Sequence, residues 1–133
     1  MVDSSALVGV LLEEPWSGAF LNALLLSGMK VMSAFNLFES AAVLEAHKGT
    51  AGRLVLDSFC AALEIEVAPF TAQHARLASE AWRRYGKGRH AAGLDLGDCC
   101  AYALALSTGL PLLAKGDDFS LTDVELAVVE STG

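Results

Sequence analysis

The sequence predicts an α/β fold, with a mostly parallel central sheet of about five strands and helices on both faces. Two observations support this prediction. Short apolar segments typical of strands alternate with helical segments along the whole chain, and no linker, internal repeat or low-complexity tract interrupts them. The 133 residues are 53% hydrophobic and 19% charged, which suffices for one buried core and argues against disorder. We therefore expect a single domain over residues 1–133.

The opening residues "MVD" are expected to form a short strand that ends at Asp3. Ser4 and Ser5 can cap the helix that follows, "ALVGVLLEE". Pro15 suits the first turn of a second helix, "WSGAFLNALLL", which ends at "SG" (27–28). The apolar content of these two helices leaves room for an exposed patch that could serve a dimer or another protein partner.

A second strand is expected at "KVMSA" (30–34). The helix after it covers 36–49, with Asn36 near its cap and Gly49 past its end. Residues 50–62 are expected to form a further helix.

The second half of the chain continues the alternation. "EIEVAPF" (64–70) alternates apolar and polar residues with a period of two, as a strand does. The next helix covers 71–86, with Thr71 as its cap and Gly86 as its terminator. A loop rich in Gly, Lys and Arg leads to a helix that begins near Asp95. Two final strands are expected at "LPLLAK" (110–115) and "VELAVV" (124–129).

Charge, cysteines and hydropathy exclude several classes of protein. A net charge of −7 argues against broad electrostatic capture of nucleic acid, although a local basic patch or a bound cation can offset it. Cys60, Cys99 and Cys100 form neither a disulfide framework nor a zinc pair, so buried thiols in a reducing cytoplasm are expected. Apolar runs stop short of the roughly 18 residues of a membrane span, and no basic region precedes them. We expect a cytoplasmic protein that does not associate with membranes.

Acidic residues follow nearly every expected strand, and only "EIEVAPF" ends without one. In open parallel sheets, sites form outside the carboxyl ends of the strands, where the strand order reverses. Acids that are distant in sequence are therefore expected to meet at one edge of the sheet. The acids that follow strands are Asp3, Glu39, Asp117 and Asp118, while Asp95 and Asp98 open the helix before the fourth strand.

Such a cluster needs compensation for its charge. Two carboxylates about 5 Å apart repel by roughly 3 kcal/mol at an effective dielectric constant near 20. Mg²⁺ or Mn²⁺ is the natural compensator, because hard divalent cations bind carboxylate oxygen and water. Such an ion can hold a phosphodiester and lower the pKa of an attacking water, so the sequence indicates phosphodiester hydrolysis.

Each acid also has a structural explanation. Asp3 precedes a helix that it could cap, and Glu39 could face solvent, as we expect of Glu45. For Asp95, capping or an accessory role is favoured over direct metal contact. The segment "WRRYGKGRH" (82–90) either complements a helix dipole or follows RNA phosphates. Both readings are kept for its four basic residues, Arg83, Arg84, Lys87 and Arg89.

Four stretches carry a family resemblance: "VDSSALV" (2–8), "SAFNLFESAAVLEA" (33–46), "YGKGRHAAGLDLGDCCAYALA" (85–105) and "LLAKGDDFSLTDV" (112–124). In this order and spacing they resemble the PIN-domain ribonucleases, specifically the VapC-type toxins of bacterial type II toxin–antitoxin pairs. The resemblance implies a compact α/β sandwich and endonucleolytic cleavage of RNA by a metal-activated water, with Mg²⁺ or Mn²⁺. It also implies a homodimer that a cognate VapB-type antitoxin inhibits.

The resemblance also implies roles for individual residues. Ser5 matches a small hydroxyl residue beside the first acid. Asp117 occupies a position whose residue varies within the family, so it ranks lower as a candidate site residue. Asp95 replaces the usual Asn and adds an acid, while one residue fewer than in the usual "MVID" precedes Asp3, which shortens the first strand. The metal-binding and catalytic positions are matched by Asp3, Glu39, Asp98 and Asp118.

Parts of the sequence also suit other functions. A catalytically inactive PIN-like interaction module is the main alternative. For the nuclease, transfer, ribosomal and messenger RNA are all compatible substrates. A receiver-type phosphoacceptor domain could use Lys115, but "EIEVAPF" offers no acceptor Asp after the third strand. A dinucleotide-binding enzyme is disfavoured because no Gly-rich turn follows the first strand.

Overall fold

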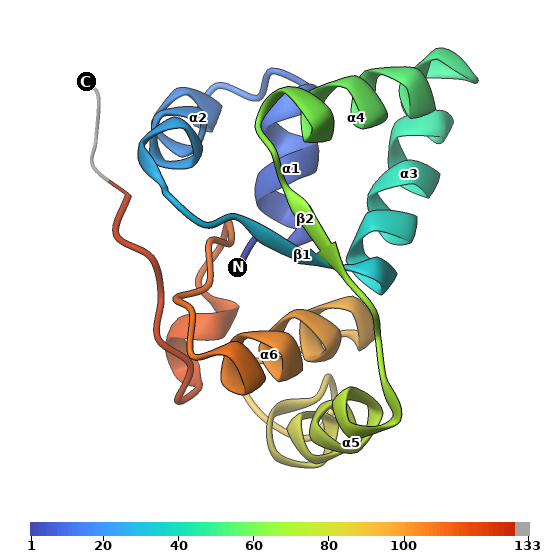
Figure 1. Ribbon diagram of the computed structural model, residues 1–133. Coiled ribbons are helices and arrows are strands. Elements are labelled where there is room, and N and C mark those ends of the chain that lie inside the picture. The colour runs from blue at the N-terminus through green and yellow to red at the C-terminus, as the bar shows by residue number, and fades with distance from the viewer. Residues whose placement is uncertain (130–133) are drawn as a thin grey trace.

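The computed structural model describes residues 1–129, and its helices and short extended segments alternate in the predicted order (Figure 1). The regular elements are α1 (Ser4–Leu11), α2 (Ser17–Leu26), β1 (Val31–Ser33), α3 (Ala34–Lys48), α4 (Ala51–Ala62), β2 (Glu66–Ala68), α5 (Ala72–Tyr85), α6 (Leu96–Thr108) and the 3₁₀ helix η1 (Asp118–Leu121).

The sheet is smaller than the sequence predicts. Its two regular strands, β1 and β2, pair in parallel, with Val31 opposite Glu66. Three further segments continue the arrangement only through isolated bridges, Val2 to Leu113 and Leu112 to Leu126. The five-strand sheet is therefore not confirmed.

Local chemistry explains why the expected outer strands are so short. Asp3 already caps α1, so the first extended segment ends at this residue. The N–H of Val2 donates to the carbonyl of Val31 at 2.8 Å, and that of Asp3 to Leu113 at 3.0 Å. Pro111, at the start of the next expected strand, has no N–H to donate. These hydrogen bonds still align segment 1–3 beside β1 and segment 112–113 beside segment 1–3.

Several helix boundaries follow the predicted signals. Thr71 caps α5 and Gly86 ends it, while Gly49 ends α3. Two predicted caps are wrong: Asp3 caps α1 in place of Ser4 or Ser5, and Ser33 caps α3 in place of Asn36. Pro15 also lies before α2 rather than in its first turn.

Helices cover both faces of the sheet, with α1 to α4 on one side and α5 and α6 on the other (Figure 1). Successive residues of an extended segment point to opposite faces. Accordingly, Val31 joins the core cluster under α5 and α6, whereas Met32 joins the cluster under α1 to α4. The same division separates Leu112 from Leu113. The carboxyl ends of these segments are thus fixed between two packed layers.

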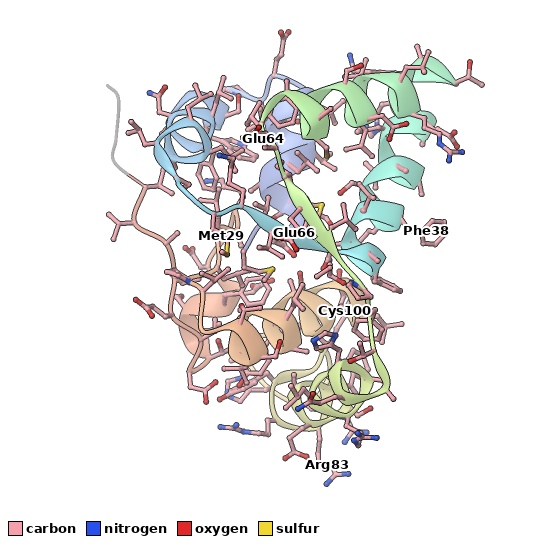
Figure 2. The ribbon with its side chains drawn as sticks, in the orientation of Figure 1. Met29, Phe38, Glu64, Glu66, Arg83 and Cys100 are labelled. Carbon is pink, nitrogen blue, oxygen red and sulfur yellow. The ribbon has the colours of Figure 1, made fainter. Side chains whose placement is uncertain are left out.

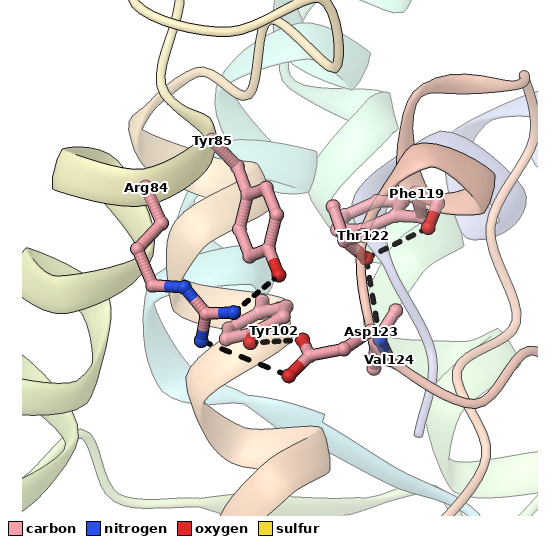
Figure 3. A network of polar contacts seen from close by, with 7 residues as sticks. All are labelled: Arg84, Tyr85, Tyr102, Phe119, Thr122, Asp123 and Val124. Atoms are coloured by element: carbon pink, nitrogen blue, oxygen red, sulfur yellow. Dashed lines mark hydrogen bonds and ion pairs between the residues drawn. The ribbon is translucent and has the colours of Figure 1, made fainter.

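A polar network attaches the last described segment to α5 and α6 (Figure 3). The hydroxyl of Tyr102, a buried side chain of α6, donates to the carboxylate of Asp123. Arg84 donates to the hydroxyl of Tyr85 at 2.8 Å and forms an ion pair with Asp123 at 3.7 Å. Thr122 donates to the carbonyl of Phe119 at 2.7 Å. The network therefore holds η1 against the helical layer.

Candidate metal centre

The candidate site lies where the first turns of α1, α3 and α6 converge beside the carboxyl end of β1 (Figure 1). Each of these turns supplies predicted acids. Asp3 precedes α1, Glu39 lies in α3, and Asp98 lies in the first turn of α6. The sequence separations are large, so only the tertiary fold can bring these side chains together.

Asp3 is the most buried of these acids, with 2% of its surface exposed. Its Oδ2 accepts two hydrogen bonds from Ser5, one from the N–H at 3.1 Å and one from the hydroxyl at 2.6 Å. The Ser5 hydroxyl in turn accepts from the N–H of Lys115 at 2.9 Å, which ties Asp3 to the segment after Leu113. The other oxygen, Oδ1, is buried and has no hydrogen-bond partner among the described residues.

Glu39 lies directly against the first turn of α6. A Cβ atom at Gly97 would lie only 2.3 Å from Oε2 of Glu39 and 2.5 Å from Oε1. The fully buried Asn36, one turn earlier in α3, donates to Oε1 at 3.4 Å. The absence of a side chain at Gly97 therefore makes room for this carboxylate beside Asp98.

Asp95 and Asp98 form a reciprocal cap at the start of α6. The N–H of Asp98 donates to Oδ1 of Asp95 at 2.8 Å, and the N–H of Asp95 donates to Oδ2 of Asp98 at 3.0 Å. The interpretation of Asp95 as a cap is confirmed. The cap also holds Asp95 and Asp98 on either side, in sequence, of Gly97, the residue against which Glu39 packs.

Electrostatics show that these acids share one environment. Burial raises the pKa of Asp3 to about 6, with smaller upward contributions from Glu39 and Asp95. Burial also raises the pKa of Asp98 well above its ordinary value, and the charges of Asp3 and Asp95 add to the rise. The pKa of Cys100, in α6, rises to about 11 through burial and the nearby charges of Glu39 and Asp95.

The donor set fits a hard divalent cation. The site offers carboxylate oxygens, one of them buried and unpartnered on Asp3, and these repelling charges need a compensating positive charge. As the side chains stand, no three His, Cys, Asp or Glu residues within 1–129 are grouped closely enough to hold a metal. Binding would therefore require the carboxylates of Glu39 and Asp98 to rotate toward Oδ1 of Asp3, and the cap contact of Asp98 would have to adjust.

Two predicted acids lie outside this cluster. Asp117 and Asp118 are exposed at the start of η1. No described contact joins either side chain to Asp3, Glu39 or Asp98. The backbone contact between Lys115 and Ser5 nevertheless brings the loop that leads to η1 up to Asp3.

The predicted basic residues differ in their surroundings. Arg84 is engaged with Tyr85 and Asp123, and Arg83 forms an exposed ion pair with Glu80 at 3.7 Å. Figure 2 shows Arg83 pointing away from the fold. Lys87 and Arg89 are exposed on the loop that leads to α6.

That basic loop folds back toward the acids. The N–H of Lys87 donates to the carbonyl of Leu94 at 2.9 Å, and Leu94 directly precedes Asp95. Of the four basic residues, Lys87 is therefore tied by its backbone to the edge of the acidic cluster.

Sequence reasoning missed two residues of the site, Asn36 and Gly97. Asn36 was interpreted only as a cap, because an Asn near a helix start usually has that role. Gly97 belongs to a motif that does not indicate a role for it, and its close contact with Glu39 depends on how α3 packs against α6. No local signal in the sequence reports such an approach.

The chain is similar to several known proteins. The family model described as "PIN domain" matches residues 1–125. Over 93% of its length the chain is 42% identical to "Ribonuclease VapC" of Mycolicibacterium smegmatis, covering 96% of that protein. It is 41% identical to "Ribonuclease VapC30" of Mycobacterium tuberculosis, over 93% of this chain and 95% of that one.

A solved structure shows the same fold. The crystal structure of VapC20 of Mycobacterium tuberculosis, described as a "Sarcin-Ricin loop cleaving toxin", superposes with a TM-score of 0.76. The superposition covers 92% of this chain and 94% of that one, at 17% identity.

Within the described residues, no helix is long and apolar enough to cross a membrane.

Proposed function

The chain belongs to the PIN-domain family, among its VapC-type ribonucleases, and on this basis we propose that it is an Mg²⁺- or Mn²⁺-dependent endoribonuclease. We further propose that it is the toxin of a type II, VapBC-type toxin–antitoxin system in the cytoplasm. The observation that carries the proposal is the buried Oδ1 of Asp3, which has no hydrogen-bond partner among the described residues, in a carboxyl group whose pKa is raised by burial and by the charges of Glu39 and Asp95.

The side chains of the site would have distinct roles in the reaction. Asp3, Glu39 and Asp98 would hold the ion, and Asp118 would join them from η1. Bound there, Mg²⁺ or Mn²⁺ would neutralise the carboxylates, lower the pKa of the attacking water and stabilise the leaving oxygen. Ser5 orients Asp3 through its two hydrogen bonds, so that Oδ1 is the oxygen left free for the ion.

The basic loop supports RNA as the substrate. Lys87 and Arg89 are exposed beside the start of α6 and can neutralise phosphates that approach the acidic cluster. Arg83 and Arg84 extend the same segment, although Arg84 also has the structural role described above. Single-stranded or loop RNA suits this site, because its backbone can be splayed toward a small acidic pocket.

Family membership also supports two protein partners, a cognate VapB-type antitoxin and a second copy of the chain. An apolar groove of about 670 Å³ runs along α2, and Leu26 and Met29 on its wall are 87% and 67% exposed. Met29 is labelled in Figure 2. We assign this groove to an apolar segment of the antitoxin, since large exposed side chains of this kind mark interaction surfaces.

Cleavage by the variant Asp98→Asn tests the proposed activity. Asn keeps an oxygen that can accept from the N–H of Asp95, so α6 stays capped while one negative charge is lost. With Mg²⁺ or Mn²⁺ present, we expect the purified parent to cut RNA and the variant to lose at least about 100-fold in rate. Equal rates for both proteins would remove Asp98 from the mechanism. A parent that binds its antitoxin but cuts no RNA would identify the inactive interaction module instead.

A further inference from the structure

Among the polar side chains near the predicted acids, the uncharged side chain of Asn36 makes the most polar contacts. It is fully buried, and its Nδ2 lies within hydrogen-bond distance of three acceptors on three elements. These are the hydroxyl of Ser4 at 3.2 Å, the carbonyl of Gly97 at 3.0 Å and Oε1 of Glu39 at 3.4 Å. A single amide thus links α1, α3 and α6 at the point where each supplies an acid.

The contacts of Asn36 have a consequence for each acid. Ser4 follows Asp3 directly, and its hydroxyl donates back to the carbonyl of Asn36 at 3.1 Å. Gly97 directly precedes Asp98, so the hydrogen bond from Asn36 to the carbonyl of Gly97 holds the first turn of α6 in place. Glu39 has no other described hydrogen-bond partner for its carboxylate. Without Asn36, Glu39 would keep only its packing against Gly97.

We propose that Asn36 is a positioning residue that holds Glu39, and with it the first turns of α1 and α6, at the place where the divalent ion would bind. This inference rests on the proposed function and adds to it a residue that touches neither metal nor RNA. Groups that hydrogen-bond to metal ligands typically contribute about 10- to 100-fold to metal affinity.

The test is Mn²⁺ binding to the whole chain, measured by calorimetry without RNA, for the parent and for Asn36→Ala. Ser40→Ala is the matched control, because Ser40 is equally buried one turn later and donates only to the carbonyl of Asn36, at 2.8 Å. Both variants lose a buried hydrogen bond and should unfold at lower urea concentrations. Only Asn36→Ala should bind Mn²⁺ more weakly, by about tenfold or more.

A double-mutant cycle separates positioning from general destabilisation. If Asn36 acts through Glu39, then Asn36→Ala should weaken Mn²⁺ binding much less in a Glu39→Ala background than in the parent. Should Asn36→Ala fail to fold, Asn36→Ser replaces it. A helical Ser bonds to the carbonyl four residues earlier and cannot hold Glu39, so the same loss is expected.

The outcomes distinguish this inference from the proposed function. A parent that binds no Mn²⁺ contradicts the metal-dependent nuclease itself. A parent that binds Mn²⁺, together with a folded Asn36 variant of equal affinity or with additive effects in the cycle, overturns the positioning role alone.

Discussion

The buried carboxyl group of Asp3 links the stability of the metal-free protein to pH. Burial raises its pKa from an ordinary value of 3.8 to about 6, so the folded state holds this proton more tightly than the unfolded chain does. The contribution of Asp3 to stability is therefore greatest below pH 4 and declines as the pH rises to about 6. The full decline is about 3 kcal/mol.

Urea unfolding of the parent and of Asp3→Asn between pH 4 and pH 7, without metal, measures this effect. Asn carries no titrating charge, so the variant should gain stability relative to the parent as the pH rises through this range. Mn²⁺ added at pH 7 should stabilise the parent and leave Asp3→Asn nearly unchanged. A stability difference that stays constant with pH would show that Asp3 is not a buried, titrating acid.

Two glutamates on α3 allow a residue of the proposed site to be compared with a surface residue of the same helix. Glu39 lies against Gly97, whereas Glu45 is exposed. We expect Glu39→Gln to lower RNA cleavage by at least about 100-fold, because it removes a negative charge that the ion requires. Glu45→Gln should keep the parental rate. Similar rates for the two variants in a gel-based cleavage assay would place Glu39 outside the site.

The sequence was informative for single residues wherever charge or a motif marked them. The sequence predicts that Asp3, Glu39, Asp95 and Asp98 meet, and in the structure the charges of Glu39 and Asp95 raise the pKa of Asp3 while those of Asp3 and Asp95 raise the pKa of Asp98. A shared metal site stays a prediction, since no three of these acids are grouped closely enough within 1–129 to hold an ion. The joining of Asp117 and Asp118 to the same cluster stays a prediction. Asn36 escaped notice because its importance comes from three contacts across the fold, whereas its local sequence indicates only a cap.

At the scale of elements, α6 combines two roles in its first turn. Its reciprocal cap satisfies backbone N–H groups with the same carboxylates that crowd the acidic cluster. Capping and helix-dipole interactions favour these charges at a helix N-terminus, while their neighbours Asp3 and Glu39 oppose them. The balance between these effects can be tested at Asp95, which caps the helix.

Asp95→Asn should cap α6 as well as Asp does, because both residues are good N-caps, and it removes one repelling charge. We therefore expect unchanged or higher stability and retained cleavage. Asp95→Ala loses the hydrogen bond to the N–H of Asp98 and should lower the free energy of unfolding by about 1 kcal/mol. Urea denaturation of the three proteins checks both effects, and equal stability of the Ala and Asn variants would contradict the capping role.

Helices were easier to predict than strands in this chain. Thr71, Gly86 and Gly49 mark helix ends through local chemistry, and the structure uses them as predicted. The expected caps of α1 and α3 shifted because Asp3 and Ser33 stand one to three residues earlier and already accept the free N–H groups. A sequence with several adjacent cap-forming residues does not specify which one is used.

At the scale of the whole molecule, the predicted layers are present but the sheet is reduced. Alternation along the extended segments sends Val31 and Met32 into separate cores, as a covered sheet requires. Strand length could not be predicted, because it depends on which backbone groups are already used for caps and bridges. The site tolerates this reduction, since short segments suffice to place the starts of α1, α3 and α6 next to one another.

The central claim is that acids from distant segments gather around one divalent cation. A crystal of the protein grown with Mn²⁺ tests it most directly, through the position of the anomalous scattering peak. We predict one peak or a close pair, bounded by carboxylate oxygens of Asp3, Glu39 and Asp98 at about 2.1 Å. A well-ordered crystal in saturating Mn²⁺ with no peak there, or with Mn²⁺ bound only elsewhere, would contradict the account.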